Sequence, residues 1–177
     1  MGVENEAEGL YQESLIHLER WELKEAEEVL WKVLDIEPNH VRALNKLGVV
    51  YAHRQQLDQA ERFFNEAVQT DPQFADAYSN LGNIYQERGW TDRALSAYQK
   101  ALFLDPGHPA ATHNMGVLYR KTGNIGKGVD LLKQAARAEK GRLRGKIYSS
   151  PRTKRLIGLG WAVVILIGLL VLFFLNR

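Results

Sequence analysis

The chain has 177 residues, and its 23 Lys and Arg against 21 Asp and Glu give a formal net charge of +2 at pH 7. It contains no cysteine, which excludes disulfides, thiolate metal ligands, cysteine nucleophiles and sites for prenylation or palmitoylation. The charge is uneven, because residues 1–40 carry a net charge of −8 and residues 41–140 a net charge of +3. The acidic part is either a solvated cap or a docking site for a basic partner.

The first residues do not resemble a secretory signal. Residues 1–6 are expected to form an N-terminal tail, and Met1 to Gly9 are acidic and polar. A secretory signal needs a basic start followed by an apolar stretch. We therefore expect that nothing exports the N-terminal part of the chain.

A repeat of 34 residues organises the next part of the chain. Five columns keep this spacing, through Pro38, Pro72 and Pro106; Ala26, Ala60 and Ala94; Gly48, Gly82 and Gly116; Tyr51, Tyr85 and Tyr119; and Leu30, Phe64, Tyr98 and Leu132. Apolar residues within each copy recur at helical spacing, so each copy predicts two amphipathic helices joined by a short turn. Glycine and alanine stand where two antiparallel helices must approach each other, and large apolar residues fill the space beside them.

These columns resemble the tetratricopeptide repeat, in which an aromatic or Leu, a Leu-Gly pair, Tyr, Ala, a large apolar residue and Pro recur over 34 residues. The resemblance is carried best by residues 75–108, through Tyr78, Leu81-Gly82, Tyr85, Gly89, Ala94, Tyr98, Ala101 and Pro106. The resemblance implies an all-α fold, a right-handed α-solenoid of four helix pairs. The expected repeats are residues 7–40 (degenerate), 41–74, 75–108 and 109–142 (divergent, with Gly128 for Ala and Lys140 for Pro).

The resemblance also implies a concave groove lined by the first helix of each pair, which binds segments of other proteins. The groove residues expected to contact a peptide are Asn45, Lys46, His53, Asn80, Asn83, Asn114 and Arg120. A carboxamide offers both a donor and an acceptor, so the asparagines are suited to hold a peptide backbone. The alternative is that asparagine simply follows the family pattern at these positions.

Some family members clamp the terminal carboxylate of chaperones with lysine, arginine and asparagine. One register of this chain supplies Asn45, Val49, Asn80, Ala110 and Asn114, and the other supplies Tyr11, Leu15, Lys46, Asp76 and Asn80. Neither register has the charges of the clamp, so the sequence predicts no chaperone carboxylate clamp.

No motif in the chain indicates catalysis. There is no phosphate-binding loop, paired-histidine helix or nucleophile turn. The five histidines are scattered, and without cysteine they do not form a metal-binding pattern. We therefore expect a protein that is not an enzyme, with no catalytic residues, no metal and no cofactor.

An uncharged stretch, residues 156–175, predicts a transmembrane helix. Twenty helical residues span about 30 Å, the thickness of the bilayer core. Fifteen of the twenty are Leu, Ile, Val or Phe. These residues favour insertion by about 5 to 9 kcal/mol, which argues against the alternative of a buried core helix.

A basic juxtamembrane linker, residues 143–155, precedes this stretch. Six basic residues lie within the fifteen positions before the span, and no acidic residue lies among them: Arg142, Arg144, Lys146, Arg152, Lys154 and Arg155. Basic excess marks the cytoplasmic side, so residues 1–155 are expected in the cytosol and residues 176–177 form a short tail on the far side. The linker is explained by topology and anionic lipid, so no nucleic-acid partner is expected.

The sequence therefore predicts a tail-anchored scaffold or adaptor that binds a protein or peptide partner in its groove and the lipid bilayer through residues 156–175. The alternative is a structural module that self-assembles into membrane-associated homo-oligomers. The regular repeats resemble a bacterial protein, which makes the inner membrane the expected location. Tail-anchored adaptors of mitochondrial or peroxisomal fission resemble it less, since they have about two divergent repeats.

Overall fold

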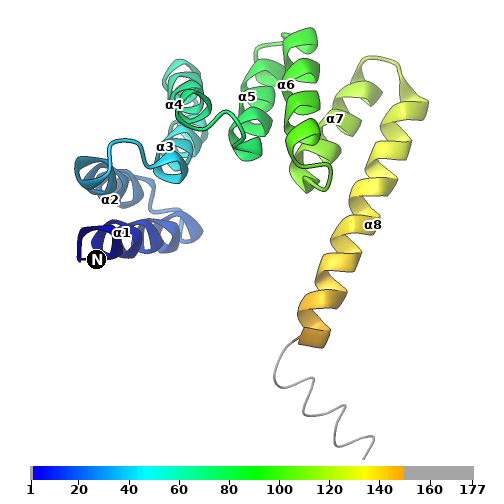
Figure 1. Ribbon diagram of the computed structural model, residues 1–177. Helices are drawn as coiled ribbons and strands as arrows, with labels where there is room; N and C mark the ends of the chain where they lie inside the picture. Colours follow the sequence, from blue (N-terminus) through cyan, green and yellow to red (C-terminus); the bar gives the residue numbers. More distant parts are fainter. Residues whose placement is uncertain (1, 150–177) are drawn as a thin grey trace, which may run out of the picture. The chain divides into compact units, whose positions relative to one another are not determined.

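The computed structural model describes the backbone of residues 2–149 and the side chains of residues 6–141. This part of the chain forms eight helices and no strand (Figure 1). The helices are α1 (Gly2–Glu19), α2 (Leu23–Ile36), α3 (Val41–His53), α4 (Leu57–Thr70), α5 (Ala75–Glu87), α6 (Thr91–Leu104), α7 (Pro109–Lys121) and α8 (Ile125–Ser149). The predicted all-α helical repeat architecture is confirmed for these residues.

The predicted membrane segment, residues 156–175, lies outside the described residues. Among the helices that the structure describes, none combines the length and the apolar character needed to cross a bilayer. The contacts divide the chain into the units Met1–Ala135 and Ala136–Arg177, and the packing below is that of the first unit.

Both ends of the repeat region are more helical than the sequence analysis expected. Helix α1 already begins at Gly2, inside the expected tail of residues 1–6, where glutamates favour the positive end of the helix dipole. Helix α8 continues to Ser149, into the expected linker of residues 143–155. Gly141 and Gly145 each cost about 1 kcal/mol of helix propensity, but no proline interrupts the segment before Pro151.

The helices pack in antiparallel pairs. Helix α1 packs on α2, α3 on α4 and α5 on α6, and each second helix also packs on the first helix of the next pair. The first helices α3, α5 and α7 contact one another as well, so they form one layer. A continuous apolar core joins the first three pairs, with Leu30, Leu47 and Phe64 almost fully buried.

Each of the two central pairs is held by an aromatic ring against a glycine. A Cβ atom added to Gly82 would lie 2.4 Å from Cε1 of Tyr98, and one added to Gly48 would lie 2.4 Å from Cε1 of Phe64. No side chain fits in this space, so glycine is required for the two helices to approach this closely. The 34-residue spacing of the glycine and aromatic columns follows from this contact.

The junctions between successive pairs differ in chemistry. Arg54 pairs with Glu27 at the first junction, and Arg88 pairs with Glu61 one repeat later. Thr122 and Leu95 occupy these two positions at the third junction.

A histidine bridges the third junction. His108 Nδ1 accepts a hydrogen bond from the Ala111 amide at 3.1 Å, so its Nε2 carries the proton and donates to Asp76 Oδ1 at 2.9 Å. His108 itself is buried. The hydrogen bond from His108 holds the pKa of the Asp76 carboxyl below its usual value.

Replacing Gly82 by Ala tests the close approach of α5 and α6. The new Cβ collides with the Tyr98 ring, so we expect the Gly82→Ala variant to lose about 1 to 3 kcal/mol of unfolding free energy. Gly9→Ala is the matched control: it lies in α1 with open space around it, and should gain up to about 1 kcal/mol from helix propensity. Urea denaturation of the full-length protein measures both. A Gly82→Ala variant as stable as Gly9→Ala would contradict this packing.

Replacing Asp76 by Asn tests the third junction. The amide oxygen still accepts the hydrogen bond from His108, but the charge is lost. The pKa of Asp76 is lower in the folded than in the unfolded state, so its ionised form stabilises the fold above about pH 4 and this contribution disappears at lower pH. Because Asp76 is largely exposed, we expect the variant to be less stable by at most about 1 kcal/mol near neutral pH.

The stability difference between the wild type and Asp76→Asn should shrink as the pH falls from about 6 to about 3. Thermal denaturation across this range measures it. Asp35→Asn, an exposed change on α2, is the control and should not show the same convergence. A difference that stays constant with pH would contradict the role given to the Asp76 charge.

Candidate functional site

The layer of first helices carries the seven side chains predicted to contact a peptide. Asn45, Lys46 and His53 lie on α3, Asn80 and Asn83 on α5, and Asn114 and Arg120 on α7. The outer surface of α1, α3, α5 and α7 is called the first-helix face below. Short distances between these side chains decide which of them can reach a ligand.

The four asparagines bond to one another rather than standing apart. Asn80 Nδ2 donates to Asn45 Oδ1 at 2.9 Å, which links α5 to α3. Asn114 Nδ2 donates to Asn83 Oδ1 at 2.7 Å, which links α7 to α5. These two bonds form an amide ladder across three first helices, a role that the sequence analysis did not anticipate.

The rungs of the amide ladder differ in accessibility. Asn45 is only 4% exposed, so it serves the junction and is not available to a ligand. Asn83 accepts a second hydrogen bond from the Tyr98 hydroxyl at 2.8 Å. Burial raises the pKa of Tyr98, so this hydroxyl stays protonated and remains a donor. Asn80 and Asn114 are half-buried, and their Oδ1 atoms accept no hydrogen bond from the described residues.

The remaining predicted residues have individual surroundings. Lys46 is half-buried, and the exposed His53 lies in edge contact with the Trp21 ring at 4.9 Å. The stem of Arg120 packs against Gly128, where an added Cβ would lie 2.5 Å from Arg120 Cγ. This contact explains why glycine replaces the alanine of the other repeats at position 128.

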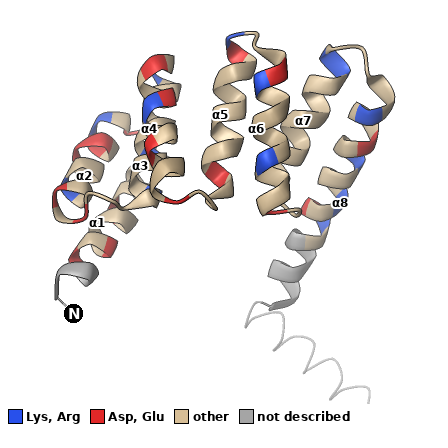
Figure 2. Ribbon diagram, turned by 45° about the horizontal axis from the view of Figure 1, so that its top comes forward, with Lys and Arg blue, Asp and Glu red and all other residues tan. Residues whose placement is uncertain are grey.

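The N-terminal end of the first-helix face is closed by paired charges. Arg42 donates to Glu8 at 2.5 Å, and its guanidinium lies 4.6 Å from the centroid of the Tyr11 ring. The hydrogen bonds from Gln12 and Arg42 lower the pKa of Glu8. Acidic side chains are prominent on the N-terminal helices and basic ones on α8 (Figure 2).

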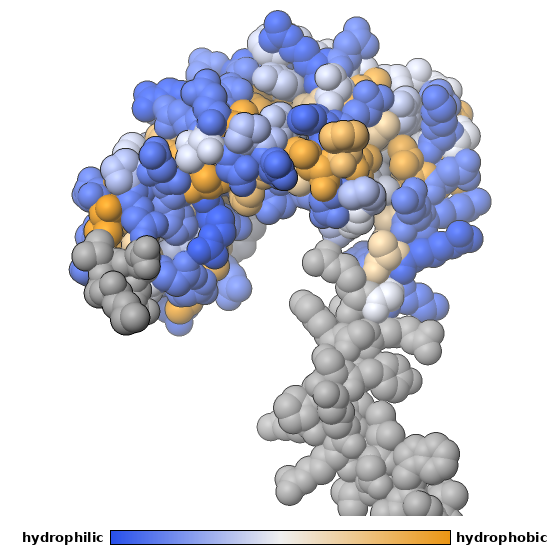
Figure 3. Space-filling model, in the orientation of Figure 1, coloured by the Kyte–Doolittle hydropathy of each residue, from blue (hydrophilic) through white to orange (hydrophobic). Residues whose placement is uncertain are grey.

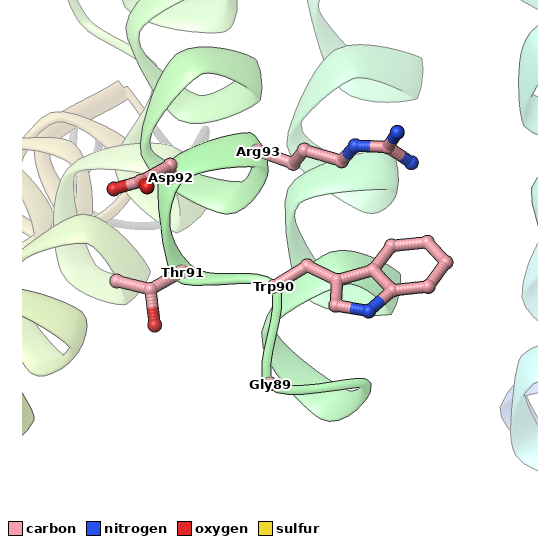
Figure 4. A pocket seen from close by; sticks show the side chains of 5 residues that line it. All are labelled: Gly89, Trp90, Thr91, Asp92 and Arg93. Atoms are coloured by element: carbon pink, nitrogen blue, oxygen red, sulfur yellow. The ribbon is translucent and has the colours of Figure 1, made fainter.

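The sequence analysis missed an aromatic and cationic cluster at the turn between α5 and α6. The guanidinium groups of Arg88 and Arg93 each lie 4.9 Å from the Trp90 ring. Figure 4 shows Trp90 and Arg93 extending to the same side of the turn, away from Thr91 and Asp92. The signal was present in the sequence, because Trp90 is an exposed tryptophan with arginines two residues before and three residues after it.

The described residues offer recognition groups and no metal centre. They contain no cluster of three or more His, Asp or Glu side chains that could hold a metal ion. The surface seen in Figure 3 is mostly hydrophilic, with small apolar patches between the polar side chains. Such a surface is suited to hydrogen bonding along an extended partner.

Solved structures of other proteins share this fold. A crystal structure of MamA is 25% identical with a TM-score of 0.64, over 78% of this chain and 81% of that chain. The PilF protein of Pseudomonas aeruginosa is 20% identical with a TM-score of 0.72, over 79% of this chain and 64% of that chain. The first TPR of Spaghetti (RPAP3), bound to the HSP90 peptide SRMEEVD, is 20% identical with a TM-score of 0.61, over 66% of this chain and 93% of that chain.

A comparison with curated proteins found no match. Two family models do match the sequence, and both describe the tetratricopeptide repeat. One covers residues 17–84 and the other residues 75–108, so together they span more than half of the chain. The chain belongs to the tetratricopeptide repeat family.

Proposed function

We propose that the protein is a membrane-tethered scaffold or adaptor that binds a protein or peptide partner on its first-helix face and carries out no catalysis. The observation that supports it is the amide ladder, because Asn80 and Asn114 are each held by one hydrogen bond and keep an unused carboxamide oxygen. A polar group that is already fixed loses little side-chain entropy when it binds a ligand.

The partner is an extended segment recognised mainly through its backbone. The unused oxygens of Asn80 and Asn114 can accept hydrogen bonds from backbone amides, whatever side chains the partner carries. The Spaghetti domain of similar fold carries a peptide, which is a precedent for peptide binding on this architecture. The present chain lacks the charges of a carboxylate clamp, so its partner need not end in an acidic tail.

The tether is the apolar stretch of residues 156–175. Its basic flank, from Arg142 to Arg155, places the repeats on the cytosolic side. Regular repeats of this kind support a bacterial inner membrane as the location. In this arrangement the anchor keeps the first-helix face near membrane-associated partners and raises their effective concentration.

Replacing Asn80 and Asn114 together by Ala tests the first-helix face. The variant loses both carboxamide oxygens offered to the partner, so we expect capture of the partner by membrane-inserted full-length protein to fall by about tenfold. Partners are captured by pull-down and identified by mass spectrometry, with the wild type beside the variant.

The double substitution also removes two bonds between helices, so circular dichroism must show that the variant remains folded. A second measurement avoids this difficulty: a photo-crosslinking residue at the exposed position His113 on α7 should capture the partner, whereas one at the exposed Gln99 on α6 should not. Unchanged capture by a folded double variant would exclude this face. Recovery of the protein itself as the only product would favour self-assembly into membrane-associated oligomers.

A further inference from the structure

Phe63 fills the second-helix side of the junction between α2, α3 and α4. Its ring stacks on Tyr51 with centroids 5.2 Å apart and an interplanar angle of 5°. Trp31 covers it edge-on, with centroids 5.7 Å apart. The three rings form one block, and Phe63 is only 4% exposed.

The same place one repeat later is a pocket. Counting 34 residues on, Asn65 stands for Trp31, Ala97 for Phe63 and Tyr85 for Tyr51. The two substitutions remove the rings that close the earlier junction. A cavity of about 500 Å³ lies there, between α4, α5 and α6, lined among others by Asn65, Tyr78, Tyr85, Arg93, Ala97 and Lys100.

The pocket presents aromatic surface with no ring at the position of Phe63. Tyr85 is half-buried, and its aromatic neighbour is Trp90, tilted with centroids 6.0 Å apart. Tyr78 forms another wall, with Lys100 Nζ 5.8 Å from its ring centroid. Since Phe63 stacks on Tyr51 in the equivalent place, the fold accommodates an aromatic side chain against this tyrosine.

The charge at the rim is reversed between the two junctions. Gln59 and Glu66 of the earlier repeat are replaced by Arg93 and Lys100. Glu66 forms an ion pair with Arg62, whereas neither Arg93 nor Lys100 belongs to any of the ion pairs found among the described residues. Both side chains are exposed, and Figure 4 shows Arg93 extended above the Trp90 ring. Two exposed cations beside aromatic walls complement an acidic partner.

We propose that this pocket is a second docking site, which takes an aromatic side chain from an acidic segment of a partner protein. The aromatic ring occupies the place that Phe63 holds in the preceding repeat and stacks on Tyr85. Carboxylates beside it pair with Arg93 and Lys100. The site lies on the second-helix side, so it is independent of the proposed ligand of the first-helix face.

Three synthetic peptides test the chemistry of the occupant. The first has a tryptophan flanked by two acidic residues on each side, the second has alanine in place of the tryptophan, and the third has lysine in place of the acidic residues. Each carries a fluorescent label, and binding to full-length protein in detergent micelles is followed by fluorescence anisotropy. The first peptide should bind at least about tenfold more tightly than either of the others.

Filling the pocket should abolish this binding. The Ala97→Phe substitution copies the Phe63 arrangement onto Tyr85, so the variant should remain folded, melt at a higher temperature and bind the acidic tryptophan peptide at least about tenfold more weakly. Gln99→Phe adds the same ring to an exposed position of α6 outside the pocket and is the matched control. It should bind the peptide as the wild type does.

A second variant keeps the proposal testable if Ala97→Phe misfolds. Arg93→Glu with Lys100→Glu changes only exposed side chains and should also weaken the acidic peptide by about tenfold. The Asn80→Ala, Asn114→Ala variant should bind the peptide unchanged, which separates the two sites. The proposal is overturned if the wild type does not prefer the acidic tryptophan peptide, or if both pocket variants bind it with wild-type affinity.

Discussion

The contact between an aromatic ring and a glycine backbone sets the geometry on which the other features depend. Tyr98 against Gly82, and Phe64 against Gly48, fix how closely the two helices of a pair approach. Because the two central pairs repeat the same contact, successive pairs stack with the same offset and the first helices come to lie side by side. The hydrogen bond from Asn80 to Asn45 is possible only at this spacing, as is the bond from Asn114 to Asn83. The amide ladder is therefore a consequence of packing that is located on the other side of each first helix.

Stability and recognition are carried by different positions of the repeat. The glycine, alanine and large apolar columns make the pairs, while the junctions vary from an Arg–Glu pair to the His108–Asp76 bond. In a linear stack each pair contacts only its neighbours, so a change at one junction acts locally. This arrangement lets one junction exchange Trp31 and Phe63 for Asn65 and Ala97 while the neighbouring pairs keep their core.

The sequence predicted the repeat but not the use of its polar side chains. A 34-residue period in glycine and aromatic columns reports helix contacts directly, since only a small residue fits against the Tyr98 ring. The amide ladder was not visible, because its bonds join residues 35 and 31 positions apart, which are different registers of the same period. The length of α8 was underestimated, since its glycines lower helix propensity without blocking a backbone hydrogen bond. The pocket was detectable in principle, by comparing Phe63 with Ala97 in the column that the family pattern leaves free.

An emptied position in a repeat has an energetic consequence that a simple loss of core does not capture. Burying a phenylalanine side chain contributes about 1.5 to 3 kcal/mol, so the junction with Ala97 forgoes a contribution that Phe63 makes one repeat earlier. A partner that supplies the missing ring restores it, and because only the folded stack offers the Tyr85 surface, binding and the stability of this junction are linked. The linkage acts where Arg88, Trp90 and Arg93 already crowd the turn between α5 and α6. A ligand in the pocket therefore stabilises α5 and α6 against each other, and through α5 it favours the register in which Asn80 and Asn83 present the amide ladder.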